Sequence, residues 1–276
     1  MKVIHRVGFA ATSSQRRELE GLGVKLPSGI AMPGGGNPFV AFDIAEDHPN
    51  WEQVRTLLQH WDISEGHVRT EFSKQEISDA DWLEIGAWHH GYPQPDEDVF
   101  GYRQVTYDLT DWCEQCGAGK RQKAAFQMKG EPKWGQNGIL QLTWIYDELF
   151  VRPEVWSSIF EPHGIGFRPV QNTKGAELKT VVQLVVEEHV GVETEGLPFE
   201  RCPRCERVKY LPVARGSFPP LKSQPMKAMA KTLEYFGSGG QADQRVVISQ
   251  ALAKTLASNK VRGPSLRPVR ALSISS

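Results

Sequence analysis

The sequence lacks any long apolar run, and it has only four cysteines among 276 residues. A membrane-spanning helix needs about 20 consecutive apolar residues, so we expect no membrane partner. With 39% hydrophobic and 24% charged residues, the chain is not a collagen-like chain, a coiled coil, a disulfide-dense mini-protein or a mostly disordered chain. A chain of this length can bury a large core in one or two domains.

Signals for export and for catalysis are also missing. Residues 1–12 contain a short apolar stretch without a small-residue cleavage site, so we expect a cytoplasmic protein. No G-x-S-x-G elbow, Walker loop, H-E-x-x-H or dinucleotide fingerprint occurs. Acidic residues gather at 96–98, and without a partner motif they are typical of a solvated loop. The sequence therefore favours a non-catalytic function over an enzymatic one.

The N-terminal third reads as alternating strands and helices. Residues 3–10, 39–44 and 68–72 have strand patterns, and residues 15–22 and 51–61 have helical spacing, with the run Thr12-Ser13-Ser14 in a position to cap the first helix. This β-α-β-α-β order predicts a ferredoxin-like domain over residues 1–90. We place the domain boundary in the turn-rich stretch 88–95.

Residues 91–276 contain an internal repeat. The run Phe167-Arg168-Pro169-Val170 matches Leu266-Arg267-Pro268-Val269, and each run follows a glycine and a short helical pattern. Each also lies downstream of one C-x-x-C pair. We therefore predict an α+β fold whose second domain is a duplicated β-rich module, with copies at about 108–170 and 200–270. Outside the matching runs, the pattern predicts a strand at 139–146 and a helix at 226–236.

All four cysteines fall into two C-x-x-C pairs, Cys113 with Cys116 and Cys202 with Cys205. A C-x-x-C turn lets two thiolates converge on one ion, and tetrahedral Zn²⁺ takes four such sulfurs. The prediction is one structural Zn²⁺ that joins the two copies of the module. Because a four-sulfur site has no open position, it would not be catalytic.

Three other roles for the cysteines stay open. A disulfide is disfavoured in a reducing compartment. A redox C-x-x-C needs its first cysteine at the start of a helix, which Gly117 and Gly119 do not favour, whereas the pair Cys202–Cys205 is more redox-like. An iron–sulfur cluster also accepts four cysteines.

The charge is distributed unevenly along the chain. Residues 201–276 contain 14 Lys and Arg against 3 Asp and Glu, and the remainder contains 18 against 30. Internal pairing between these two parts is the simpler interpretation. The alternative is a nucleic-acid-binding surface. Its candidate residues are Arg201, Arg204, Arg207 and Lys209.

The sequence resembles the bacterial double-CxxCG motif family over about residues 100–276. The resemblance depends on Cys113-Glu114-Gln115-Cys116-Gly117, on Cys202-Pro203-Arg204-Cys205, and on the stretch from Tyr235-Phe236-Gly237-Ser238-Gly239 to Gly263. The second pair departs from the pattern, since Glu206 replaces the expected glycine. Some members of the family are immunity proteins that neutralise a toxin delivered by neighbouring cells. The resemblance thus implies binding of a protein partner such as a toxin, and no catalytic residue. A nucleic-acid binder and a C-x-x-C redox enzyme are the alternatives.

Overall fold

The computed structural model describes residues 1–91, 93–94 and 100–271. The acidic residues at 96–98 and part of the predicted linker therefore lie outside the described residues. The chain divides into two compact units, residues 1–74 with 213–216 and residues 75–212 with 217–276. Each unit is described by itself.

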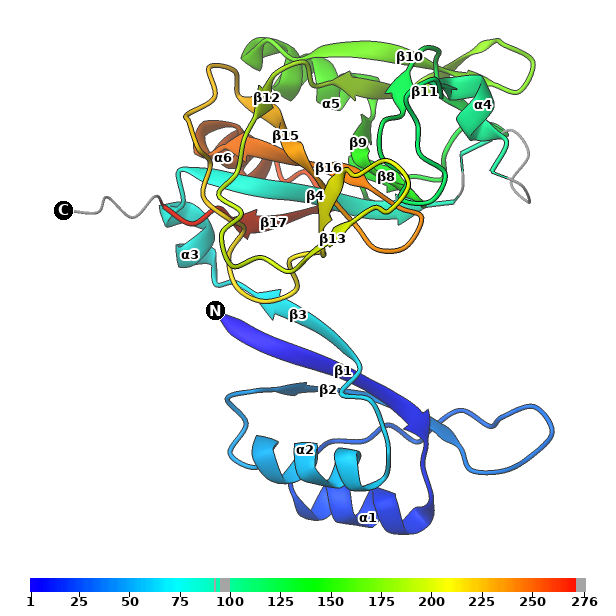
Figure 1. The fold of residues 1–276 in the computed structure, drawn as a ribbon, viewed down its shortest axis with the longest axis vertical. Helices are drawn as coiled ribbons and strands as arrows, with labels where there is room; N and C mark the ends of the chain where they lie inside the picture. Colours follow the sequence, from blue (N-terminus) through cyan, green and yellow to red (C-terminus); the bar gives the residue numbers. More distant parts are fainter. Residues whose placement is uncertain (92, 95–99, 272–276) are drawn as a thin grey trace. The chain divides into compact units, whose positions relative to one another are not determined.

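The first unit is a three-stranded sheet with two helices on one face (Figure 1). The central strand β1 runs antiparallel to both neighbours, in the order β2-β1-β3. The Thr12 hydroxyl accepts the Gln15 N–H and the Gln15 side chain accepts the Thr12 N–H, which closes a capping box at the first helix. The elements are β1 (Lys2–Ala10), α1 (Ser13–Gly21), β2 (Phe39–Ala45), α2 (Trp51–His60) and β3 (His67–Glu71).

The predicted element order holds up to β3, but the arrangement differs from a ferredoxin-like one. That fold has two β-α-β crossovers and four strands. Here α1 joins two antiparallel neighbours and makes no crossover, whereas α2 crosses from β2 to the parallel strand β3 on the other side of β1. The next strand, β4 (Trp82–His90), pairs with strands of the second unit. The chain consequently divides near residue 74, whereas the sequence placed a boundary in 88–95.

The second unit is built on one large mixed sheet in the order β13-β14-β15-β16-β4-β8-β9-β11-β10-β7, with β12 beside β15 and β17 beside β4. Its helical elements are α3 (Lys74–Asp79), α4 (Tyr102–Thr106), α5 (Pro153–Val155), the π-helical turn η1 (Trp156–Phe160), the 3₁₀ turn η2 (Glu161–His163) and α6 (Gln250–Ser258). The remaining strands are β5 (Tyr107–Asp108), β6 (Arg121–Gln122), β7 (Gln127–Met128), β8 (Ile139–Leu142), β9 (Ile145–Val151), β10 (Gly166–Asn172), β11 (Glu177–Val185), β12 (His189–Val190), β13 (Phe199–Arg201), β14 (Val208–Tyr210), β15 (Met229–Phe236), β16 (Asp243–Ser249) and β17 (Pro264–Pro268).

Two segments of this unit differ from their predicted structure. Residues 139–146 are not one strand, because β8 and β9 form a hairpin whose turn contains Trp144 at φ 70°. Residues 226–236 are not a helix, because β15 occupies 229–236. Pairing with β12, β14 and β16 outweighs the helical spacing of its apolar residues.

The two runs that match in sequence have the same local topology. Strands β9 and β10 flank a helical segment, and β11 lies between them, antiparallel to both. Strands β16 and β17 flank α6, and β4 lies between them, antiparallel to both. Each run is therefore a β-α-β unit with a third strand inserted in its middle.

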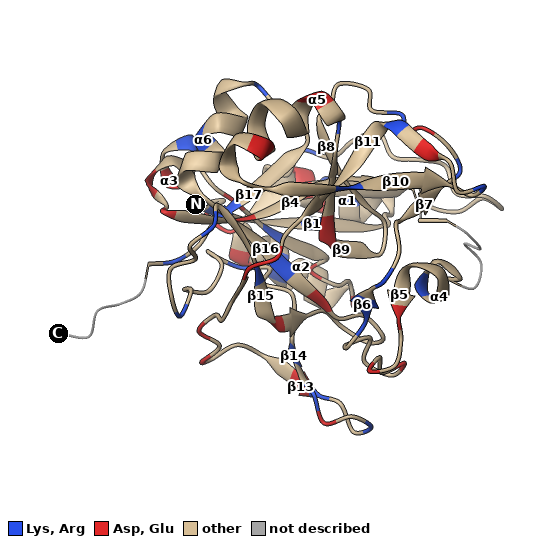
Figure 2. Ribbon diagram, turned by 90° about the horizontal axis from the view of Figure 1, so that it is seen from above, with Lys and Arg blue, Asp and Glu red and all other residues tan. Residues whose placement is uncertain are grey.

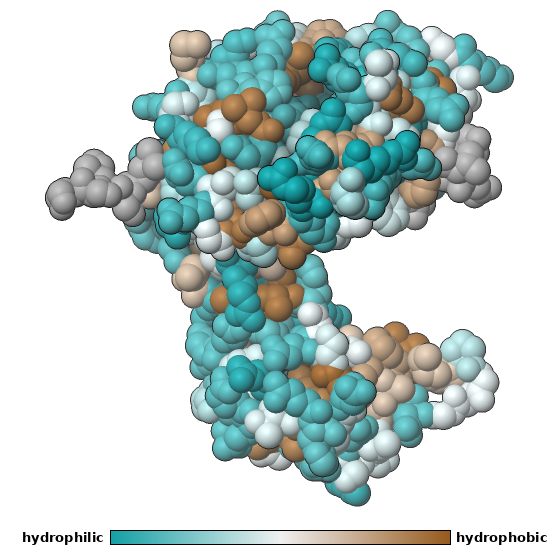
Figure 3. Space-filling view, in the orientation of Figure 1, coloured by the Kyte–Doolittle hydropathy of each residue, from teal (hydrophilic) through white to brown (hydrophobic). Residues whose placement is uncertain are grey.

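On the face shown in Figure 3, apolar residues (brown) form small separate patches over both units and no single large apolar area. Within the described part of the chain, none of the helices has the length and apolar character to span a membrane.

Candidate metal centre

Two hairpin loops carry the cysteine pairs. The first knuckle (residues 109–120) connects the antiparallel strands β5 and β6, and the second knuckle (residues 202–207) connects β13 and β14. Each loop has the same two backbone hydrogen bonds. The amides of Cys113 and Cys202 donate to the carbonyls of Ala118 and Arg207, at 2.9 Å in both loops, and the amides of Gly117 and Glu206 donate to the carbonyls of Cys113 and Cys202, at 2.7 and 2.8 Å.

The structure brings together the four cysteines that the sequence singled out. Their sulfurs all lie within 4.8 Å of one another, and three of the four residues are buried. The closest pairs join the two knuckles, with Sγ–Sγ distances of 3.7 Å for Cys113 and Cys202 and 3.6 Å for Cys116 and Cys205. Tetrahedral coordination with metal–sulfur bonds of about 2.3 Å places sulfurs about 3.8 Å apart. The four thiols can therefore hold one metal ion, and they are too far apart to be disulfides.

The backbone of the knuckles favours thiolates at the leading cysteines. The N–H of Cys116 donates toward the sulfur of Cys113 and lowers the pKa of that thiol to about 6. The N–H of Cys205 likewise lowers the pKa of Cys202. Burial raises the pKa of Cys116 to about 12. Four sulfurs this close cannot all ionise without a cation, so a divalent metal suits the site electrostatically.

The residue after each second cysteine has a left-handed backbone, at φ 83° for Gly117 and φ 61° for Glu206. Glycine adopts this conformation without a steric cost, whereas an L-residue loses about 1–2 kcal/mol. Gly117 has a second constraint, because a Cβ there would lie 2.4 Å from the Gly240 carbonyl oxygen. Glu206 is exposed and takes the same backbone conformation with a full side chain. The departure from the expected glycine is thus tolerated in the second knuckle alone.

We expect Gly117→Ala and Glu206→Gly to have opposite effects. Gly117→Ala should lower the free energy of unfolding by about 2–3 kcal/mol, through the left-handed backbone and the clash with Gly240. Glu206→Gly should leave it unchanged or raise it by up to about 1 kcal/mol. Urea unfolding of the metal-loaded chain measures both. An equal loss in the two variants would contradict this account of the turns.

The four basic residues proposed for nucleic-acid binding all have partners within the second unit, and two of them, Arg204 and Arg207, contact the first knuckle. The Lys209 side chain is 4% exposed, so it cannot reach a phosphate group at the surface. Their contacts are Arg201 with the Glu206 carbonyl at 3.1 Å, Arg204 with the Glu114 carboxylate at 3.8 Å, Arg207 with the Asp111 carbonyl at 2.6 Å, and Lys209 with the carbonyls of Gly239 and Gln241. These contacts favour a structural role for the group.

Internal pairing also accounts for much of the charge asymmetry along the chain. Figure 2 shows Lys and Arg interspersed with Asp and Glu along the elements of the second unit. Several ion pairs join a basic residue beyond 200 to an acidic residue before it. They include Arg204 with Glu114, Lys227 with Glu187, Lys231 with Glu148, and both Arg245 and Arg267 with Glu84.

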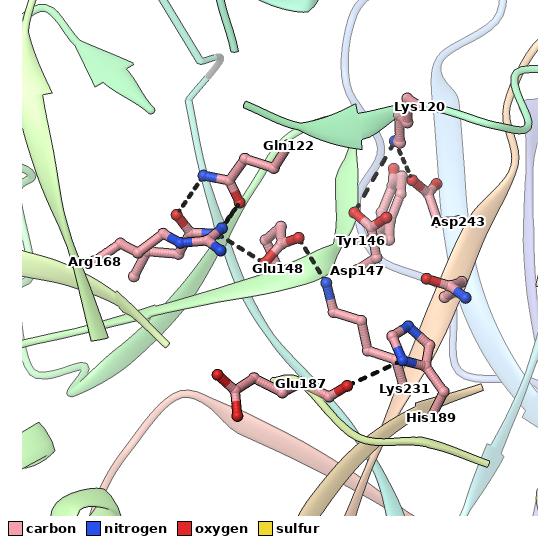
Figure 4. Close-up of polar contacts among 12 residues, drawn as sticks. Lys120, Gln122, Tyr146, Asp147, Glu148, Arg168, Glu187, His189, Lys231 and Asp243 are labelled. Carbon is pink, nitrogen blue, oxygen red and sulfur yellow. Dashed lines mark hydrogen bonds and ion pairs between the residues drawn. The ribbon is translucent and has the colours of Figure 1, made fainter. Parts of the chain in front are cut away.

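A buried charge network involves Lys120 of the first knuckle and residues of β9, β15 and β16 (Figure 4). The Lys120 ammonium is 2.7 Å from Asp243 and 4.0 Å from Asp147, and the Lys231 ammonium is 2.6 Å from Glu148. Burial alone would lower the pKa of Lys120, but the carboxylates of Asp147 and Asp243 raise it. Burial raises the pKa of Asp243, and the negative charge of the nearby Asp147 carboxylate adds to this rise.

This network was not among the sites predicted from the sequence. A signal was present in the run Ile145–Val151, which is apolar except for the adjacent Asp147 and Glu148. Charged side chains in a strand that is buried on both faces must be paired. The pattern therefore predicts two basic partners for Asp147 and Glu148. The sequence does not indicate which basic residues these partners are, because Lys120 and Lys231 are distant from β9 along the chain.

Comparison of the chain with protein-family models, with curated proteins and with solved structures found no match.

Proposed function

We propose that this chain is a zinc-stabilised protein that acts by binding a protein partner and not by catalysis. The observation that carries the proposal is the arrangement of the four sulfurs, which lie within 4.8 Å of one another at spacings that suit one tetrahedral ion. Such a site leaves no open position for a substrate or for an activated water. The metal would therefore act on the fold, as the link between two hairpins that are far apart in sequence.

Zinc is the ion that we propose for a reducing, cytoplasmic setting, where thiols stay free. The similar knuckles and the similar β-α-β units support the further proposal that the second unit arose from a duplicated module. In that case the ion lies between the two copies and joins them.

The partner that we propose is a bacterial toxin, which this chain would neutralise as an immunity protein. The support is the resemblance of the two cysteine motifs to the double-CxxCG family. The buried Lys209 and the paired Arg204 and Arg207 make a nucleic acid a weaker candidate partner.

Co-expression tests this function directly. We expect a gene next to this one to encode a product that stops growth, and co-expression of this chain to restore growth. Cys202→Ser should abolish the rescue, whereas Met32→Ser, in an exposed loop of the first unit, should retain it. The proposal fails if no neighbouring gene product is toxic, or if this chain does not restore growth in its presence.

A further inference from the structure

Strand β13 ends the large sheet of the second unit and has a partner on one side alone. It pairs with β14, and no other strand in the described part of the chain pairs with it. Figure 2 shows this hairpin projecting from the rest of the sheet. Residues 198–201 are all exposed. An exposed edge strand of this kind is a template on which a further strand can form.

The register of the hairpin shows which backbone groups of β13 point outward. In an antiparallel pair, residues that exchange hydrogen bonds alternate with residues that do not. The amide of Leu211 donates to the Pro198 carbonyl at 3.0 Å, so Phe199 and Arg201, one and three residues further along, exchange no hydrogen bonds with β14. Their N–H and C=O groups therefore point away from β14, and no described residue is hydrogen-bonded to these four groups.

A shallow groove of about 800 Å³ lies at the start of β13, with an aromatic pair in its lining. Phe199 is 61% exposed, and its ring centre is 6.4 Å from that of Tyr210. The ring of Tyr210 in turn lies 5.9 Å from the buried ring of Phe236. These contacts hold Tyr210 in place and leave Phe199 open to an apolar side chain of a partner.

The groove is acidic. Glu193 and Glu195 line it, and both are exposed and form no ion pair with a described residue. Glu200 of β13 adds a third carboxylate, 48% exposed, which lies 3.4 Å from the buried Lys209. The described residues that line the groove include no Lys or Arg, and the nearest arginine along the chain, Arg201, contacts a carbonyl of the second knuckle at 3.1 Å. The charge at this edge therefore favours a positively charged segment.

From these observations we propose that the β13 edge binds an extended, basic segment of a protein partner as an added strand. The backbone of the segment would pair with the outward groups of Phe199 and Arg201, and one of its apolar side chains would pack on the Phe199 ring. A Lys or Arg of the segment would reach the carboxylates of Glu193 and Glu195. This inference rests on the proposed function of protein binding, and it adds the surface and the chemistry of the bound segment.

Titration of the full metal-loaded chain with three short blocked peptides tests the proposal, read by fluorescence anisotropy. The first peptide alternates valine and arginine, the second alternates valine and glutamate, and the third is the first with every backbone amide methylated. We expect the first to bind with a dissociation constant below about 1 mM, and the other two at least about tenfold more weakly, because one lacks the positive charge and the other the backbone donors. Equal binding of either control peptide, or no saturable binding of the first, would overturn the proposal.

Two variants assign the binding to this edge. Phe199→Ala and Glu193→Gln/Glu195→Gln should each weaken the first peptide at least about fivefold, with zinc content and unfolding midpoint unchanged, because the three side chains are exposed. The matched control Glu154→Gln/Glu161→Gln removes the same charge from exposed residues elsewhere in the second unit, and should change the affinity less than about twofold. Equal weakening in the two double variants would refute the assignment.

Sedimentation of the free chain tests for a different occupant of the edge. We expect a monomer at the concentration of the titration. A dimer that dissociates in Phe199→Ala would show that a second copy of the chain covers β13, and would overturn the proposal. Peptide binding is measured without the partner, so its failure would leave the growth-rescue test of the proposed function standing.

Discussion

Cys202→Ser, or removal of the metal by a chelator, should unfold the part of the second unit that holds the two knuckles. The apparent free energy of binding to a structural four-ligand zinc site is on the order of 10 kcal/mol at neutral pH, and it contributes to folding because the unfolded chain has no site. The strands next to the knuckles add little support, since β5, β6, β13 and β14 contain two or three residues each. Metal analysis should give one zinc per chain before treatment and none after it.

The thermal unfolding midpoint and the near-ultraviolet circular dichroism measure the structural effect. We expect the midpoint to fall by roughly 10 °C or more in Cys202→Ser and after chelation. Met32→Ser is the control, because it removes a sulfur from an exposed loop of the first unit and should leave both zinc content and midpoint unchanged. A chain that keeps its midpoint after complete loss of metal would show that the four sulfurs do not form a structural centre.

Breaking the buried pair of Lys231 and Glu148 has the second-largest expected effect. Both side chains are about nine-tenths buried, and the ammonium is 2.6 Å from the carboxylate. Lys231→Met leaves the Glu148 charge without its cation in the core, which costs about 3–5 kcal/mol of the free energy of unfolding. Urea unfolding of the metal-loaded chain measures this loss.

The chain offers a matched control for this experiment. Lys227 and Glu187 form a pair with the same 2.6 Å separation, but 48% of the Lys227 side chain and 68% of the Glu187 side chain are exposed. Lys227→Met should cost no more than about 1 kcal/mol, since water screens an exposed pair. The double variant Lys231→Met/Glu148→Gln should recover at least half of the loss, because a neutral amide can still contact Gln183. Equal losses in Lys231→Met and Lys227→Met would contradict a special cost of burial.

Local signals in the sequence predicted the first unit well. The N-terminal cap of α1, the strand β1 and the spacing of apolar residues in α2 involve residues close together in the chain. The physical terms that shape such elements are local, namely capping hydrogen bonds and the side-chain period of a helix or a strand. Even there, the order of strands in the sheet was not predicted.

Long-range contacts decided the segments for which the prediction was wrong. Residues 229–236 have the apolar spacing of a helix, yet three partner strands from elsewhere in the chain make them a strand. Strand β4 follows the first unit directly in sequence, but its hydrogen-bonding partners are β8, β16 and β17. The division of the chain near residue 74 follows from that pairing.

The sequence by itself determined which residues can hold a metal, since it contains four cysteines in two identical spacings and none besides. Tertiary structure alone decided that sulfurs 89 residues apart come within 3.7 Å, and that Lys120 and Lys231 meet carboxylates of distant strands. The reason is that the spacing of residues along the chain shows only which side chains a single local turn can bring together. Which turns and strands then meet depends on the free energy of burying apolar surface and pairing charge across the whole fold, to which every part of the chain contributes.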